Sequence, residues 1–137
     1  MTLKLERVVY QSQAAPGADT LPSLVTILSV SQRNNERVGL TGALASHDGR
    51  FIQVLEGPSE RLDALMKRLD GDARHRSVEV LDRAPIDARR FEGWSMASAR
   101  ISPAQAEALE ALSEEPHATG ARIADILSEA IQTPAHA

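Results

Sequence analysis

One glutamine of this 137-residue chain lies where an apolar side chain would be expected. The segment RFIQVLEGP (50–58) reads as a strand, and side chains two apart on a strand share a face. Gln53 therefore shares its face with Phe51 and Leu55. A buried amide without hydrogen-bond partners costs roughly 1–3 kcal/mol, so we expect Gln53 to have partners. This placement is the first indication of a functional site. The opposite face carries Ile52, Val54 and Glu56.

The other candidates for chemistry are a phenol, a pair of amides and a final aromatic segment. Aromatic residues make up only 3% of the chain, so Tyr10 and Trp94 stand out. Each candidate also has an ordinary interpretation. Tyr10 could be a sheet-edge aromatic with a solvated hydroxyl, and Asn34-Asn35 could be a helix stop. Trp94 and Met96, which share a strand face, could be core residues.

Several kinds of site are missing from the sequence. The chain has no cysteine, which excludes disulfides and thiol nucleophiles, and its four histidines lack metal-ligand spacing, so we expect no metal. There is no G-x-S-x-G motif, no Walker loop and no glycine-rich dinucleotide motif. The net charge of −4 argues against direct binding to nucleic acid or to membrane surfaces. Without a signal-peptide pattern or an apolar run of about 20 residues, we expect a cytoplasmic protein.

The elements that must position these side chains follow from periodicity. Residues 3–12 read as a strand whose one face carries Val8, Tyr10 and Ser12. Residues 20–34 read as a helix that Asp19 or Thr20 caps and Asn34-Asn35 ends. Its stripe contains Leu24, Val25, Leu28 and either Ser31 or Gln32, and an adjoining face carries Ile27, Ser31 and Asn34 or Asn35.

The stretch 39–58 is the clearest feature, a β-hairpin turning at His47-Asp48-Gly49-Arg50. A second helix begins at Ser59 and ends at Gly71. Strands are predicted at 77–83 and 94–98, with a loop around Pro85 between them. The buried stripe of the second helix contains Leu62, Leu65, Met66 and Leu69.

The order β-α-β-β-α-β-β predicts a ferredoxin-like α+β sheet with two helices on one face. Two further helices follow: one opens at Ser102-Pro103, and the other comes after a break at 114–120. Their stripes need the back of the sheet or a second subunit for burial. We therefore expect a domain over 1–98 and a helical extension over 99–137. The stripes are Ala106, Leu109 and Leu112 in the first, and Ile123, Ile126, Leu127 and Ile131 in the second.

Taken together, the motifs resemble those of BLUF domains, the blue-light sensors that bind FAD. The matching segments occur in the family's order and spacing over about residues 3–98, and each of them alone is a weak signal. The joint presence of Tyr10, Asn35, Gln53 and Trp94-Ser95-Met96 makes the resemblance strong. The segments are VVYQS (8–12), SQRNN (31–35), GLTGAL (39–44), RFIQVLEGP (50–58), GDARHRSVEVL (71–81) and RRFEGWSM (89–96).

The resemblance implies a role for each matching position. The flavin ring of FAD would lie between the two helices, with Tyr10 and Gln53 as the photoactive pair beside it. Asn35 would bind the carbonyl edge of the ring, and Trp94 and Met96 would exchange proximity to the glutamine. The remaining cofactor-binding positions are Ser12 as a support, Ile27 packing on the ring, and Asn34, Arg68 and Asp72 as nearby contacts.

The implied function is a blue-light photoreceptor and not an enzyme. Its signal would pass through the last strand and the C-terminal helices to a downstream protein or within a homo-oligomer. One alternative is a flavin-free relative that works as a protein-interaction module. Another is a small hydrolase of the acylphosphatase type using Arg33 and Asn35, although the expected phosphate-binding loop is missing.

Overall fold

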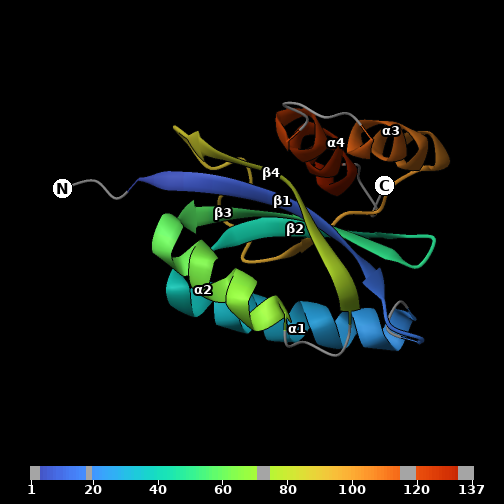
Figure 1. The fold of residues 1–137 in the computed structure, drawn as a ribbon, viewed down its shortest axis with the longest axis horizontal. Coiled ribbons are helices and arrows are strands. Elements are labelled where there is room, and N and C mark those ends of the chain that lie inside the picture. The colour runs from blue at the N-terminus through green and yellow to red at the C-terminus, as the bar shows by residue number, and fades with distance from the viewer. Residues whose placement is uncertain (1–3, 18–19, 71–74, 115–119, 133–137) are drawn as a thin grey trace.

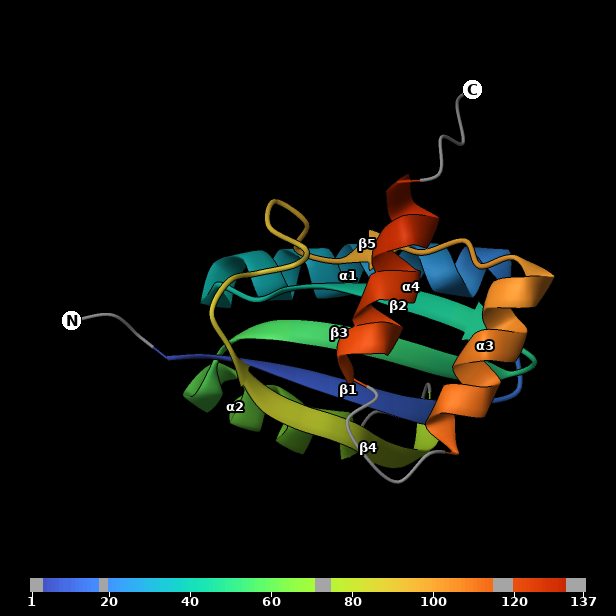
Figure 2. The ribbon, with the colours of Figure 1, turned by 90° about the horizontal axis from the view of Figure 1, so that it is seen from above.

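The computed structural model describes residues 4–17, 20–70, 75–114 and 120–132. A five-stranded sheet in the order β4-β1-β3-β2-β5 separates two layers of helices, α1 and α2 on one face and α3 and α4 on the other (Figures 1 and 2). All neighbouring strands are antiparallel except β2 and β5. This confirms the predicted ferredoxin-like α+β fold. The elements are β1 (Leu5–Ala14), α1 (Leu21–Val38), β2 (Thr41–His47), β3 (Arg50–Pro58), α2 (Ser59–Asp70), β4 (His75–Ile86), β5 (Ala97–Ser98), α3 (Pro103–Ser113) and α4 (Gly120–Gln132).

The β2–β3 hairpin is the predicted one. Asp48 and Gly49 both have positive φ, 49° and 72°, as a two-residue turn of the type that matches strand twist requires. The alternation along β3 is also confirmed. Phe51 packs in the core between the sheet and α1 and α2. Ile52 packs in the core on the other face, between the sheet and α3 and α4.

The C-terminal helices bury their stripes against the back of the sheet. Leu109 of α3 and Leu127 of α4 share one core with Val9 and Val54 of the two central strands. The capping box of α3, in which Ser102 and Gln105 exchange hydrogen bonds, fixes where that helix begins. Of the two burial sites considered from the sequence, the back of the sheet is therefore the one used.

The prediction that Asn34-Asn35 ends the first helix is wrong. α1 continues to Val38, and Gly39, with φ 76°, supplies the left-handed residue that ends it. Glycine adopts this conformation more easily than asparagine, so the later stop prevails. Val25 was also misplaced, because it is exposed and lies off the buried stripe.

Three strands have boundaries that differ from the predictions. β1 continues to Ala14, and β4 continues through Pro85 to Ile86, where a loop was expected. β4 lies at the sheet edge, where a proline without an N–H costs no ladder bond on the open side. The last strand contains only Ala97–Ser98, so Trp94 to Met96 are irregular. The proposed end of α2 at Gly71 lies outside the described residues.

Arg83 of β4 connects the start of α2 to the sheet through hydrogen bonds. Arg83 of β4 donates to Asp63 at 2.7 Å, to Glu6 of β1 at 2.8 Å and to the hydroxyl of Ser59 at 3.0 Å. Burial alone would lower the pKa of Arg83, but its hydrogen bonds to the two carboxylates and their charges outweigh burial and raise it. This contact holds α2 over the sheet at the end nearest Ser59.

We expect Gly42→Ala to destabilise the protein. A Cβ at Gly42 would collide with the backbone oxygen of Val54 in the neighbouring strand, which cannot swing aside as a side chain could. Overpacking of this kind costs about 1–3 kcal/mol, measured as the loss in free energy of unfolding in urea. Gly57→Ala is the control, since its Cβ meets first the flexible end of Leu40. Equal losses in both variants would contradict this account.

Candidate functional site

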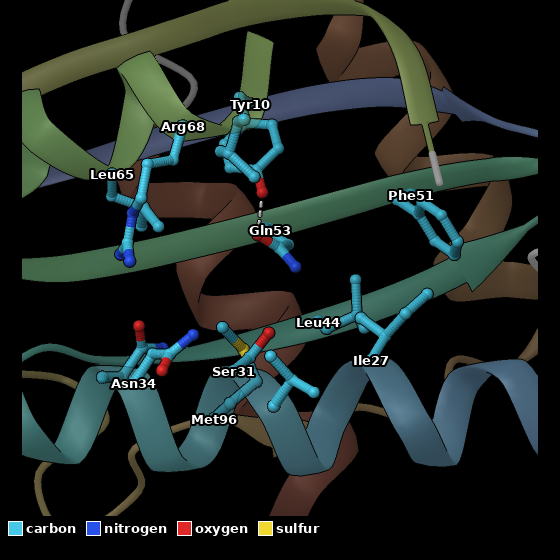
Figure 3. Close-up of a pocket in the computed structure, with 13 residues that line it drawn as sticks. Tyr10, Ile27, Ser31, Asn34, Leu44, Phe51, Gln53, Leu65, Arg68 and Met96 are labelled. Atoms are coloured by element: carbon cyan, nitrogen blue, oxygen red, sulfur yellow. Dashed lines mark hydrogen bonds between the residues drawn. The ribbon is translucent and has the colours of Figure 1, made fainter. Parts of the chain in front are cut away.

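The site is built on a direct pairing between the two central strands. Tyr10 of β1 lies opposite Gln53 of β3 in the antiparallel register, and residues directly opposite each other share a face. The hydroxyl of Tyr10 donates a hydrogen bond to Oε1 of Gln53 (Figure 3). Tyr10 is completely buried and Gln53 is 8% exposed. The amide expected to need a partner therefore has one.

A cavity of about 190 Å³ lies next to this pair, between the sheet and helices α1 and α2. The amide nitrogen of Gln53 points away from Tyr10 toward α1 (Figure 3), and it has no hydrogen-bond partner among the described residues. The residues that line the cavity are Tyr10, Leu44, Phe51 and Gln53 of the sheet, Ile27, Val30, Ser31, Asn34 and Asn35 of α1, Leu65, Arg68 and Leu69 of α2, and Met96.

The cavity has an apolar end and a polar end. Ile27, Leu44 and Phe51 lie together at one end, and Asn34 and Arg68 face each other at the opposite end (Figure 3). The guanidinium of Arg68 has no ion-pair partner among the described residues. A flat ligand with an apolar ring, a hydrogen-bonding edge and a negative charge near that edge matches this distribution.

Six of the eight predicted cofactor-binding residues line the cavity. Ser12 is buried on the same face as Tyr10 but lies outside the lining, and Asp72 lies outside the described residues. The residues in the cavity wall are Tyr10, Ile27, Asn34, Asn35, Gln53 and Arg68.

Trp94 and Met96 do not share a buried face. Met96 is 2% exposed and lines the cavity, whereas Trp94 is 51% exposed on the surface. The expectation that both are core residues is wrong for Trp94. Because the segment is not a regular strand here, the two-residue spacing does not place the two side chains on one face.

Several lining residues were not named as site residues from the sequence. Leu65 and Leu69 belong to the predicted buried stripe of α2, and Phe51 shares the strand face of Gln53. Ser31 belongs to the helix face predicted from Ile27, Ser31 and the two asparagines. The pattern marked all four as inward-facing, but it could not distinguish a cavity wall from a filled core.

A buried carboxylate holds the loop that leads to Trp94. Glu56, 1% exposed, accepts from the backbone N–H groups of Arg90 at 2.6 Å and Phe91 at 2.9 Å, and from the hydroxyl of Thr41 at 3.0 Å. Arg89 closes this cluster by donating to the same hydroxyl at 3.0 Å. The cluster joins the end of β3 and the start of β2 to the loop.

Glu56→Gln should therefore lower the free energy of unfolding by about 1.5–3 kcal/mol, the range for hydrogen bonds to a charged group. The amide would turn a donor toward one of the N–H groups that the carboxylate now accepts from. Urea denaturation measures the loss. Glu92→Gln, at an exposed position of the same loop, is the control and should stay within about 0.5 kcal/mol of wild type. If the two substitutions cost the same, the cluster does not hold the loop.

Among the described residues no group of histidines, cysteines or carboxylates could hold a metal ion. No helix in the part of the chain that the structure describes is long and apolar enough to span a membrane.

Comparison with known proteins agrees with the geometry. A family model described as sensors of blue light using FAD, BLUF, matches residues 5–97. Photoactivated adenylate cyclase subunit beta of Euglena longa is 33% identical over 96 residues, which make up 69% of this chain and 11% of that protein. The corresponding subunit of Euglena gracilis gives the same identity and coverage. The chain thus spans 11% of the length of these two relatives.

Two solved structures resemble the chain over nearly its whole length. The dark-state structure of BlrB, described as a BLUF protein, is 32% identical with a TM-score of 0.74, covering 96% of this chain and 97% of BlrB. The photo-activated state of BlsA is 25% identical with a TM-score of 0.78, covering 95% of this chain and 96% of BlsA. Both likenesses include the region beyond the family match.

Proposed function

Because this chain belongs to the BLUF family of blue-light sensors using FAD, we propose that Tyr10 and Gln53 are the groups that convert absorbed light into a signal. The observation that carries the proposal is the hydrogen bond from the Tyr10 hydroxyl to Gln53, whose amide nitrogen faces the cavity. The amide of Gln53 therefore lies between the phenol of Tyr10 and the cavity in which a ligand would bind.

The lining of the cavity fits the flavin ring of FAD. Such a ring is flat and largely apolar, with carbonyl and N–H groups along one edge. Leu44 and Ile27 would pack against its apolar part, and the amides of Asn34, Asn35 and Gln53 would bind its polar edge. Arg68, which also lines the cavity, would bind the polar edge or the phosphates of the dinucleotide tail.

Bound FAD absorbs blue light and, once excited, is a strong one-electron oxidant. Tyr10 would be the donor of one electron to it, and Oε1 of Gln53 would accept the hydroxyl proton that the oxidised phenol releases. Gln53 carries an acceptor at one end of its amide and a donor at the other. By rotating or tautomerising, it exchanges the groups that it presents to Tyr10 and to the cavity. Once the electron and the proton had returned to Tyr10, only the hydrogen bonds of Gln53 would differ.

The new position of the Gln53 amide would first change the contacts of Met96, which lines the same cavity. From there the route to the C-terminal helices runs through the loop that Glu56 holds. The side chain of Arg90 in that loop pairs with Asp125 of α4 at 2.5 Å. A local switch of this kind biases a two-state element.

We propose that the chain is a sensor and not an enzyme. Its signal would therefore act through a downstream protein or through a second copy of the chain. The sensor unit in this proposal is 1–98, with 99–137 as the extension that carries the signal. The end of the family match at residue 97 supports this division. The proposal places the protein in the cytoplasm, which cell fractionation would test.

An absorption spectrum of the purified chain tests the function. We expect a yellow protein that retains FAD through gel filtration. Under blue light its visible band should move to longer wavelength, because a stronger hydrogen bond to the ring carbonyl stabilises the excited state, and it should return in the dark. A folded protein that stays colourless when FAD is supplied would overturn the proposal and favour the flavin-free interaction module.

A further inference from the structure

Two consecutive backbone carbonyls are held by amide side chains of α1. Nε2 of Gln32 donates to the carbonyl oxygen of Met96 at 2.9 Å, and Nδ2 of Asn35 donates to that of Ser95 at 2.7 Å. Gln32 and Asn35 lie three residues apart, so they are neighbours on one face of the helix. We call these two bonds the α1 clamp.

The α1 clamp holds the segment that contains Trp94, which is exposed, and Met96, which is buried. Immediately before the clamped carbonyls, the carbonyl oxygen of Trp94 accepts from the N–H of Gly42 in β2 at 3.0 Å. Met96 closes the cavity wall and Trp94 stays outside. The segment is not a regular strand, so these bonds, rather than a continuous ladder, fix its position.

Asn35 belongs to both the cavity and the clamp. Its side chain is 2% exposed, it lines the cavity, and its amide nitrogen has a second hydrogen beside the one given to Ser95. Gln32, in contrast, is outside the cavity lining, and its contact with the switch region is the bond to Met96. Gln32 can therefore be replaced without altering any residue of the cavity lining.

We propose that Gln32 is a positioning residue for the light-driven change at Gln53 and Met96, an inference that rests on the proposed function. In the dark the α1 clamp holds Met96 in the cavity wall and Trp94 outside. Any light-driven movement of Met96 away from Gln53 has to break the Gln32–Met96 bond, and dark recovery has to form it again. The strength of this bond then sets how readily the segment leaves its dark position and how fast it returns.

The test compares Gln32→Leu and Gln32→Glu, which lack the donor, with Gln32→Lys, which restores one. Glu36→Gln, at an exposed position one turn along α1, is the control. The full chain with FAD is used, and circular dichroism checks the fold. One readout is hydrogen–deuterium exchange of the backbone amides between Trp94 and Ser98 in the dark. The other is the rate of dark recovery after blue light.

Without the donor we expect exchange protection in this segment to fall by about three- to tenfold and dark recovery to slow by a similar factor, as for loss of one hydrogen bond. Gln32→Lys and Glu36→Gln should stay within about twofold of wild type. The fluorescence of Trp94, which is the chain's single tryptophan, should report the same change in its surroundings. Flavin colour and the red shift should persist in all four variants.

Unchanged protection in Gln32→Leu and Gln32→Glu would overturn the clamp, and reduced protection with unchanged recovery would overturn its role in the switch. A wild-type chain without any light-induced shift would refute the proposed function and with it the role of Gln32 in the switch. The exchange comparison needs no light, so in that case it would still decide whether the clamp holds the segment.

Discussion

Replacing Tyr10 with phenylalanine is expected to leave a yellow, folded protein whose visible spectrum no longer shifts under blue light. The ring of Tyr10 is completely buried in the core beneath α1 and α2, and phenylalanine preserves that packing. Only the hydroxyl is lost, and with it the hydrogen bond to Gln53. Phenylalanine is a far poorer electron donor than a phenol and has no proton to release, so the switch has no first step.

The cost to folding should be small, roughly 1 kcal/mol for one neutral hydrogen bond. Phe91→Leu is a matched control, because Phe91 is an equally buried aromatic residue but belongs to the core on the opposite face of the sheet. That variant should lose stability and keep the red shift. A normal light-minus-dark absorption spectrum in Tyr10→Phe would show that the phenol is not the donor.

Gln53→Leu should have an equally large effect on the light response for a different reason. Leucine approximates the size of glutamine but has neither acceptor nor donor, so it connects neither with Tyr10 nor with the polar edge of a ligand. We expect FAD to remain bound through the rest of the cavity wall and the dark band to lie at a slightly different wavelength. Illumination should leave that band in place.

Gln11→Leu provides the control for loss of a glutamine. Gln11 is the next residue after Tyr10 in β1, but its amide donates at the surface to Glu79 at 2.8 Å. We expect the full red shift in that variant, measured by the same absorption difference. A red shift of wild-type size in Gln53→Leu would remove the amide from the mechanism, even if Tyr10 proved essential.

Much of the fold could be predicted because its signals are local. Asp48-Gly49 between two apolar runs indicates a hairpin, and alternation along β3 assigns Gln53 and Glu56 to opposite faces. The pairing of Tyr10 with Gln53 is different. Their strands lie some forty residues apart in the chain, and their register depends on the whole sheet, so the sequence connected them only through resemblance to a family.

The features that escaped prediction depend on contacts between distant segments. Glu56 was placed on an apolar face, but its partners are backbone groups of a loop that has no periodicity. Trp94 was placed inside because a regular strand was expected around it, whereas bonds from α1 shape that segment. Gln32 was one of two alternatives for the fourth position of the stripe on the first helix, but helical spacing gave no indication that it binds a backbone carbonyl of a distant segment.

The most direct test of the central claim is an infrared difference spectrum, light minus dark, of the FAD-bound chain with its glutamine side chains labelled with ¹⁵N. If Gln53 exchanges its hydrogen bonds with Tyr10 and the cofactor, the spectrum must contain amide bands that move with the label and disappear in Gln53→Leu. A wild-type spectrum that shows the light-induced change in the flavin but no label-sensitive band would contradict the account.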